Sequence, residues 1–291
     1  MINIDFFSKV SIYRDDLNHY KVSGNKLHKL APAIKQAKEK GCSTLLSFGG
    51  PYSNHLHALA WASKDNNLSC VGLIRGELHS GLTPTLRDCQ DWGMRLISLD
   101  RKMYRTLQET FIERKGEQKV QSYLNGLLEW LPNDTLVIPE GGSNLRAIKS
   151  LANAYRPIFA ENKYKGITHV VCATGTGATV AGLYEAAPKH VKVIGVQAVS
   201  EGTATHQRIH NWLESDGSRI SIIPGHLGKF AKTTPELLEF IAEFERIYDV
   251  PLDHVYNGKV LYKLNQMAAE ELFLPSDQLL VIHTGGLQGA R

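Results

Sequence analysis

The chain has few cysteines, and none of them forms a recognisable metal or redox motif. Its 291 residues include four cysteines, Cys42, Cys70, Cys89 and Cys172, and no two of these have the C-x-x-C spacing of a zinc ribbon or a dithiol site. Cys42, Cys70 and Cys172 lie beside or within apolar runs. This pattern is typical of small buried side chains in a reducing compartment and does not favour disulfides.

Long apolar segments and blocks of like charge are also missing. Residues 1–14 contain no apolar run of the length that a signal peptide needs. The longest weakly charged stretch, residues 170–184, is interrupted by Gly175, Gly177 and Gly182, so it does not predict a membrane span. The net charge is +4 and the basic residues are dispersed, which argues against nucleic-acid binding. We therefore expect a cytoplasmic enzyme or binding protein that binds neither nucleic acid nor a membrane.

What the sequence does contain is an alternation of short apolar runs with longer amphipathic segments. The apolar runs predict strands at residues 43–49, 69–74, 95–99, 136–138, 169–173, 191–198 and 278–283. Helical patterns cover residues 28–40, 54–64, 107–115, 179–187, 235–248 and 259–272. Near-continuous apolar strands that alternate with helices are typical of parallel sheets covered on both faces. The sequence thus predicts an α/β protein.

Glycine and hydroxyl residues follow several of these predicted strands. The segments are residues 49–54, 140–144, 174–177 and 284–286. Ligands of open α/β sheets bind beyond the carboxyl ends of the strands. A single glycine-rich turn is common without any ligand, but four such loops predict one composite site.

The loop at residues 174–179, Thr-Gly-Thr-Gly-Ala-Thr, joins a predicted strand to a predicted helix. Small residues let backbone N–H groups approach an anion, and the helix dipole adds attraction. No Gly-Lys-Ser/Thr follows, so this is not a Walker loop, and Val180 stands where a dinucleotide fingerprint needs glycine or alanine. The pattern favours a site for one phosphate, with a glycine-rich turn that binds nothing as the alternative.

Lys26 follows Gly24 and Asn25 at the entrance to a predicted helix. Desolvation and a neighbouring cation such as Lys29 would lower the pKa of its ammonium group and provide a neutral amine as nucleophile and base. A lysine at a helix start is more often a solvated side chain, and spacing alone does not decide between the two interpretations.

Several motifs follow one another in order between residues 14 and 286. They are Arg14-Asp15-Asp16, Gly24-Asn25-Lys26, Lys29-Leu30, residues 44–55, residues 138–144, residues 176–179, Val255-Tyr256-Asn257-Gly258-Lys259 and His283-Thr284-Gly285-Gly286. Together they resemble the 1-aminocyclopropane-1-carboxylate (ACC) deaminase/D-cysteine desulfhydrase family. These proteins are fold-type-II, tryptophan-synthase-β-like enzymes that use pyridoxal 5'-phosphate.

The resemblance implies a pyridoxal-phosphate-dependent lyase or deaminase with two parallel-sheet, three-layer domains. Residues 1–29 with 139–291 would form the large cofactor-binding domain, and residues 30–138 the small one, with the cofactor in the cleft between them. A homodimer is also implied.

The resemblance assigns roles at the cofactor. Lys26 would hold it as an internal aldimine, and Asn54 would hydrogen-bond its phenolic oxygen. Its phosphate would bind Thr176, Gly177, Ala178 and Thr179. Thr284 would face the pyridine nitrogen, and because a hydroxyl cannot protonate the ring as a carboxylic acid would, we expect the ring to stay largely neutral.

The freed Lys26 amine would remove the α-proton of the substrate. Ser53 would meet the substrate carboxylate or relay a proton, and Tyr256 would lie against the reacting amino acid. Other interpretations exist: Ser53 and Asn54 suit the start of a helix, and Tyr256 a half-buried aromatic. His55 and His57 have the spacing of a metal pair, but we see no third ligand and expect no metal.

Two positions separate the activities within this family. Ring-opening deaminases tend to carry glutamate after the tyrosine of Tyr-x-Gly-Lys and leucine in His-x-Gly-Gly, and desulfhydrases carry small hydroxyl residues at both. Here these positions are Asn257 and Thr284: the glutamate is absent and the threonine is present, which favours conversion of D-cysteine to pyruvate, sulfide and ammonia. Phe230 stands where the family places a second tyrosine, which counts against ring opening. The alternatives are an ACC deaminase, a lyase for another small amino acid, and a non-catalytic Rossmann-like metabolite-binding protein.

Overall fold

The chain forms two compact units. The computed structural model describes residues 2–22, 24–77, 81–112, 124, 126, 128–198, 203–213, 216–228 and 232–290. The first unit comprises residues 1–25 and 148–291, and the second comprises residues 26–147.

The first unit is built on a five-stranded sheet with the strand order β1-β9-β6-β7-β8. All its pairs are parallel, and its strands are β1 Val10–Tyr13, β6 His169–Thr174, β7 Lys192–Gln197, β8 Ile220–Pro224 and β9 Leu279–Ile282. Its helices are α1 Ile4–Phe7, α8 Ala178–Ala186, α9 Ala204–Trp212, α10 Pro235–Tyr248 and α11 Asn257–Ala269, together with most of α7 Leu145–Tyr155. Short 3-10 helices are η1 Asp15–Leu17, η3 Arg156–Ala160, η4 Asn162–Tyr164 and η5 Leu287–Ala290.

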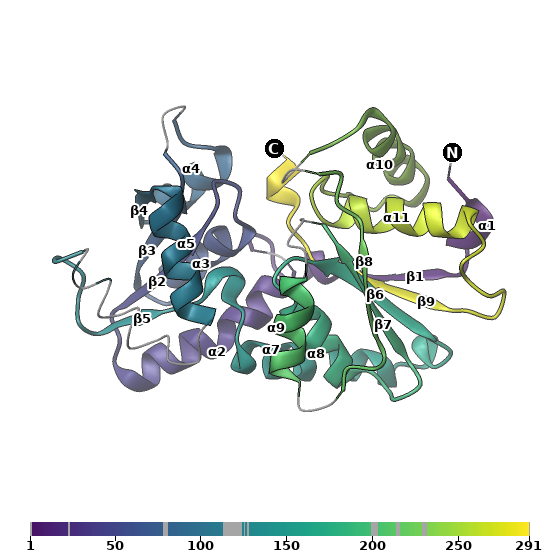
Figure 1. The fold of residues 1–291 in the computed structure, drawn as a ribbon, viewed down its shortest axis with the longest axis horizontal. Coiled ribbons are helices and arrows are strands. Elements are labelled where there is room, and N and C mark those ends of the chain that lie inside the picture. The colour runs from purple at the N-terminus through teal and green to yellow at the C-terminus, as the bar shows by residue number, and fades with distance from the viewer. Residues whose placement is uncertain are drawn as a thin grey trace. The chain divides into compact units, whose positions relative to one another are not determined.

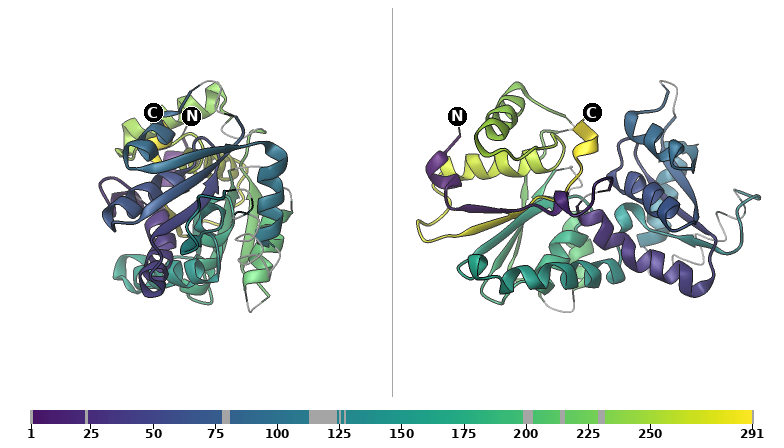
Figure 2. Two further views of the ribbon diagram at one scale, coloured as in Figure 1. Left: turned by 90° about the vertical axis from the view of Figure 1, so that its left-hand side faces the viewer. Right: turned by 180° about the vertical axis from the view of Figure 1, so that it is seen from behind.

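Helices cover both faces of this sheet because alternate residues of each strand point to opposite sides. Cys172 and Ile282 pack with residues of α7 and α8, whereas Val171 and Val281 pack with residues of α10 and α11. Figures 1 and 2 show the strands as a layer between these two sets of helices. Burial on both faces explains why the strand sequences are almost continuously apolar.

The second unit is built on a four-stranded parallel sheet with the order β4-β3-β2-β5. Its strands are β2 Thr44–Gly49, β3 Ser69–Arg75, β4 Met94–Leu99 and β5 Thr135–Val137, and its helices are α2 Asn25–Lys40, α3 Asn54–Asp65, α4 Pro84–Asp91, α5 Arg101–Ile112 and the 3-10 helix η2 Glu140–Gly142. Leu46 and Phe48 pack with residues of α5, and Ser47 hydrogen-bonds His55 of α3, so this sheet also lies between helices.

The predicted fold class, an α/β chain with two parallel sheets, is confirmed. Each of the seven predicted strands is present as a strand of β2 to β7 or as β9, with no end shifted by more than one residue. Strands β1 and β8 were not predicted, and neither were helices α1, α4, α7 and α9. Residues 113–115 of the predicted helix 107–115 lie outside the described residues.

The loops with glycine and hydroxyl residues all leave the carboxyl ends of strands. Residues 174–177 follow β6 and residues 284–286 follow β9 in the first unit, while residues 49–54 follow β2 and residues 140–144 follow β5 in the second. Because all strands of a sheet run parallel, the loops of each unit lie at one edge of its sheet.

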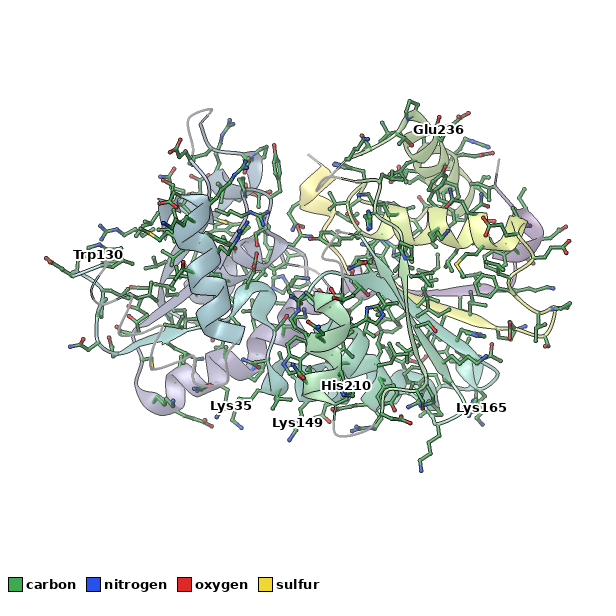
Figure 3. The ribbon with its side chains drawn as sticks, in the orientation of Figure 1. Lys35, Trp130, Lys149, Lys165, His210 and Glu236 are labelled. Carbon is green, nitrogen blue, oxygen red and sulfur yellow. The ribbon has the colours of Figure 1, made fainter. Side chains whose placement is uncertain are left out.

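Charged side chains such as Lys35, Lys165 and Glu236 point outward from their elements (Figure 3). Among the helices of the described residues, none combines the length and the apolar character required to cross a lipid bilayer.

Candidate active site

The loop between β6 and α8 forms the first part of the candidate site. Gly177 is the N-cap of α8 and has a left-handed backbone with φ of 96°. A Cβ atom there would lie 2.7 Å from Cγ1 of Ile209, so both the dihedral angle and the packing require glycine. The helix then begins at Ala178, and the N–H groups of its first turn have no carbonyl partner within the helix. This is the local geometry of an anion site.

Asn25 connects the segment before Lys26 to the loops that follow β6 and β9. Its Nδ2 donates to Oγ1 of Thr179 at 2.8 Å, and its backbone N–H donates to the carbonyl oxygen of Thr284 at 3.3 Å. Gly24 has φ of 83°, and a Cβ atom on it would collide with that same Thr284 carbonyl. Lys26 is the next residue along the chain and lies in the first turn of α2. The backbone that leads into Lys26 is therefore fixed against the loops after β6 and β9.

Thr284 is held by Asn257 in the first turn of α11. Oδ1 of Asn257 accepts the backbone N–H of Thr284 at 3.0 Å and lies 3.3 Å from its hydroxyl, which donates. Nδ2 of Asn257 donates to the carbonyl of Gly285 at 2.7 Å and to Oδ1 of Asp253 at 2.8 Å. These partners fix which end of the amide faces Thr284.

The buried carboxylate of Asp253 organises the start of α11. Its Oδ2 accepts the backbone N–H of Tyr256 at 2.6 Å, and its Oδ1 accepts that of Asn257 at 2.9 Å. Lys259 is 1% exposed, and burial lowers the pKa of its ammonium group while Asp253 opposes the shift. A buried carboxylate satisfied in this way is a rigid anchor for the residues that follow it.

Tyr256 lies near the loop at residues 174–179. A Cβ atom built on Gly175 would meet nothing nearer than Cε1 of Tyr256, at 4.0 Å. The structure therefore brings Tyr256, Thr284 and the loop at residues 174–179 together within the first unit.

In the second unit, Ser53, Asn54 and His55 begin helix α3. Ser53 is its N-cap, and the hydroxyl oxygen accepts the N–H of Leu56 at 3.2 Å, as expected for a helix start. His55 is 2% exposed, and its Nε2 lies 2.8 Å from the hydroxyl oxygen of Ser47. Burial, followed by the charges of Lys26 and Lys29, lowers the pKa of His55 to about 3. The imidazole is therefore neutral at physiological pH.

Lys29 lies one helical turn after Lys26. Its Nζ donates to Oγ of Ser143 and to the carbonyl of Gly141, both at 3.3 Å. The loop after β5 thus contacts α2 within the second unit.

The two histidines considered as a metal pair have different partners. Nε2 of His57 lies 3.0 Å from Oδ2 of Asp88, and the ring packs on the edge of Trp92. His55 contacts Ser47 instead. Across the part of the chain that the structure describes, no three histidine, cysteine, aspartate or glutamate side chains are arranged to hold a metal ion.

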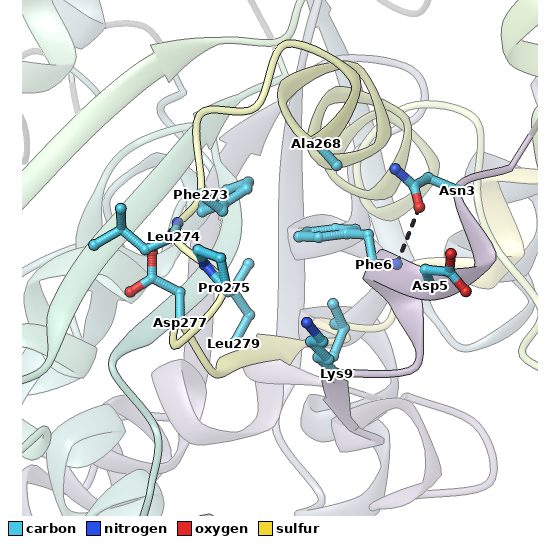
Figure 4. A pocket seen from close by; sticks show the side chains of 11 residues that line it. Asn3, Asp5, Phe6, Lys9, Ala268, Phe273, Leu274, Pro275, Asp277 and Leu279 are labelled. Carbon is cyan, nitrogen blue, oxygen red and sulfur yellow. Dashed lines mark hydrogen bonds between the residues drawn. The ribbon is translucent and has the colours of Figure 1, made fainter.

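A cavity of about 320 Å³ lies elsewhere in the first unit, beside α1 and the end of α11 (Figure 4). Its lining includes Val10 and Leu279, which are the first residues of β1 and β9. It is therefore at the amino edge of the sheet, and the candidate loops are at the carboxyl edge. None of the predicted site residues lines it.

Some site features were not found from the sequence, and one predicted feature cannot be placed. The anchoring roles of Asn25 and Asp253 were missed, although Asp253 stands three residues before Tyr256, the spacing of a side chain that caps a helix start. Phe230 lies outside the described residues.

The architecture is that of the fold-type-II enzymes. A crystal structure described as an ACC deaminase homologue is 24% identical, covers 96% of this chain and 85% of its own, and superposes with a TM-score of 0.79. A serine racemase from Dictyostelium discoideum, 12% identical, superposes with a TM-score of 0.65 over 98% of this chain and 91% of its own.

The likeness in sequence extends over nearly the whole chain, and the resemblance inferred from the motifs is confirmed. A Thermotoga maritima protein, provisionally named a 1-aminocyclopropane-1-carboxylate deaminase, is 29% identical over 303 aligned positions that cover 96% of this chain and 89% of that protein. The bifunctional D-cysteine desulfhydrase/1-aminocyclopropane-1-carboxylate deaminase of Arabidopsis thaliana is 28% identical over 96% of this chain and 72% of its own length. No family model matches the chain.

Proposed function

We propose that the protein is a pyridoxal-phosphate-dependent lyase that eliminates the β-substituent of a small amino acid, with D-cysteine as its substrate. The observation that carries this proposal is the anchoring of Asn25. Through its side chain and backbone, Asn25 joins the candidate phosphate loop to Thr284, and it is bonded directly to Lys26. The names of the sequence relatives, ACC deaminase and D-cysteine desulfhydrase, support the same class of reaction.

The residues of the first unit fit the cofactor. A Cβ atom built on Gly175 would meet only Cε1 of Tyr256 within 4 Å among the described residues, its chain neighbours left aside, and α8 begins three residues later at Ala178. Thr176, Gly177, Ala178 and Thr179 would hold the phosphate, because small side chains leave their N–H groups accessible. The hydroxyl of Thr179 accepts from Asn25 and so keeps its own proton available for a phosphate oxygen.

The remaining site residues would act on the cofactor ring and the substrate. Lys26 would bind the cofactor and then hold the proton taken from Cα of the substrate. Asn54 would hydrogen-bond the phenolic oxygen, and Tyr256 would pack against the substrate. Ser53 would bind the substrate carboxylate or relay a proton. When bound, pyridoxal phosphate supplies an electron sink for the negative charge that develops at Cα.

The surroundings of Asn257 favour desulfhydration over ring opening. Ring-opening relatives are expected to carry glutamate at this position, but here the side chain must donate to Asp253 and to the carbonyl of Gly285. A carboxylate cannot donate and would lie against a second buried carboxylate. The site is therefore built for an amide, and D-cysteine is the better candidate substrate than ACC.

The proposal also covers the domain division, the cellular location and the oligomeric state. We propose a cofactor-binding domain of residues 1–29 with 139–291 and a small domain of residues 30–138. These bounds differ from those of the two compact units, residues 1–25 with 148–291 and residues 26–147. We also propose a cytoplasmic homodimer. The family resemblance supports the domain division and the homodimer, and sedimentation of the purified protein tests the dimer.

The experiment that tests the proposed function is a release assay for ammonia, sulfide and 2-oxo acid with D-cysteine, L-cysteine and ACC. We expect the highest kcat/KM with D-cysteine and loss of turnover by at least about 10³-fold in Lys26→Ala. Lys38→Ala, a change at an exposed position on the same helix, serves as the control and should retain activity. Turnover of none of these substrates, or full activity of Lys26→Ala, would refute the proposal.

A further inference from the structure

Helix α9 backs the loop at residues 174–179 with three residues on one face. Thr205, Arg208 and Ile209 are spaced three and four residues apart, so they lie on the same side of the helix. The Ile209 side chain fills the space that a Cβ atom of Gly177 would need. The other two residues make polar contacts with the loop.

Both polar contacts are made to backbone carbonyl groups. The hydroxyl of Thr205, which is fully buried, donates to the carbonyl of Gly175 at 3.2 Å. Nε of Arg208 donates to the carbonyl of Thr176 at 3.1 Å, and its second terminal nitrogen donates to Oγ1 of Thr205 at 3.2 Å. Two successive peptide units of the loop are thus held by one connected set of hydrogen bonds.

The direction of these carbonyl groups sets the direction of the N–H groups. In a trans peptide the C=O and N–H bonds point to opposite sides. With the carbonyls of Gly175 and Thr176 turned toward α9, the N–H groups of Thr176 and Gly177 are turned away from it. Preorganised N–H groups bind an anion without a free-energy cost of reorientation.

Arg208 also compensates for the lack of charge in the loop itself. Residues 174–179 contain no lysine or arginine, yet a phosphate monoester carries between one and two negative charges at neutral pH. A guanidinium bound to the carbonyl of Thr176 polarises that peptide and makes the N–H of Gly177 a stronger donor.

We propose that Arg208 and Thr205 are positioning residues of the phosphate site: they fix two peptide units of the loop with their N–H groups directed away from α9, and Arg208 strengthens these donors electrostatically. The inference rests on the proposed function insofar as a phosphate occupies the loop. Neither residue touches the reacting atoms.

The test compares ligands with and without a phosphate. Dissociation constants of inorganic phosphate, pyridoxal phosphate and pyridoxal are measured by titration calorimetry on the full chain freed of cofactor, in wild type, Arg208→Met, Arg208→Lys and Thr205→Val. Arg208→Met should weaken inorganic phosphate and pyridoxal phosphate about tenfold. Arg208→Lys should restore part of this loss, and Thr205→Val should weaken both ligands by about threefold. Pyridoxal should change by less than twofold.

Arg219 offers a matched control. It is another arginine of the first unit that donates to backbone carbonyls, those of Pro188, Val191 and Tyr184, but it lies just before β8, at the amino edge of the sheet. Arg219→Met should lower the melting temperature and leave phosphate affinity unchanged.

Unchanged phosphate affinity in Arg208→Met would overturn the inference, and so would an equal loss of affinity for pyridoxal, which would indicate general damage to the fold. The outcome is separable from the proposed function. A chain whose inorganic phosphate affinity depends on Arg208 but which turns over no amino acid would support the inference and refute the lyase.

Discussion

Asn257 shows how a single side chain connects the start of α11 with the loop after β9. Its amide oxygen faces Thr284, and its amide nitrogen faces two oxygen acceptors, one of them on Asp253. Removing the donor end of a buried side chain leaves those acceptors unsatisfied, which costs more than the hydrogen bonds themselves contribute.

Asn257→Asp should therefore destabilise the protein although it hardly changes the shape of the side chain. It replaces the NH2 group with an oxygen 2.8 Å from Oδ1 of Asp253. We expect a loss of about 3 kcal/mol in the free energy of unfolding, measured by urea denaturation at pH 7. Asn153→Asp, an exposed position on α7, is the control and should change the free energy by less than about 0.5 kcal/mol. Equal effects at both positions would contradict this account of Asn257.

His55 links the charge of the candidate site to the stability of the second unit. Its pKa falls to about 3 in the folded chain, because the ring is buried and lies near Lys26 and Lys29. The unfolded chain has the ordinary value of about 6.5. Between these values the unfolded chain binds the extra proton, so stability is fully present above about pH 6.5 and is lost as the pH falls toward 3.

The expected size of this loss is about 2 kcal/mol between pH 7 and pH 5. The free energy of unfolding, measured with denaturant at both pH values, should therefore fall by about 2 kcal/mol less in His55→Gln than in wild type. Exposed His190 is the control, and His190→Gln should retain the pH dependence of the wild type. If the two variants have the same pH dependence, His55 is not the buried neutral group described above.

Residue types and their order on the chain indicate candidate site residues, but they do not indicate the residues that orient them. Lys26, Thr284 and the loop at residues 174–179 carry visible signals, because glycines and hydroxyl groups after strands are recognisable motifs. The partners that orient them, such as Asp253 and Arg208, are single polar residues on helices. Only the fold brings those residues to a particular carbonyl or amide.

At the scale of the elements, burial on both faces decided what could be predicted. Strands β2, β3, β6, β7 and β9 are buried almost throughout, so their sequences are continuous apolar runs. Strands β1 and β8 are the edges of the five-stranded sheet, and β8 is only partly covered. Its sequence, Ile-Ser-Ile-Ile-Pro, lies beside turn residues and gives a weaker signal.

Helix α7 follows directly on the glycine-rich loop at residues 140–144, and no helix was predicted there. In the structure it packs closely on α8, where a Cβ atom on Gly182 would lie 2.6 Å from Cβ of Leu151 and 3.2 Å from the carbonyl oxygen of Ile148. The small residue at position 182 sets the distance between the two helices.

Gly182→Ala should force α7 and α8 apart. Alanine favours a helix, but the gain of about 1 kcal/mol is outweighed by overpacking against backbone and Cβ atoms. We expect a net loss of about 1–2 kcal/mol, read from thermal unfolding by circular dichroism. Gly166→Ala is the control, since a Cβ atom there would meet nothing within 4 Å. A Gly182→Ala protein more stable than the Gly166→Ala protein would contradict this packing.

At the scale of the whole molecule, the loops with glycine and hydroxyl residues lie at the carboxyl ends of the strands in both units. Each sheet is parallel, and each sends its glycine and hydroxyl loops from the carboxyl ends of its strands. The segment that precedes Lys26 belongs to the first unit, and Lys26 begins the second. We therefore expect the cofactor to bind covalently to the side chain directly after Asn25.

Reduction of the purified protein with sodium borohydride, followed by peptide mass spectrometry, tests this claim most directly. We expect a stable adduct of pyridoxal phosphate on the peptide that contains Lys26, and no adduct in Lys26→Ala. An adduct on a different lysine, such as Lys259, or no adduct in protein saturated with pyridoxal phosphate, would contradict it.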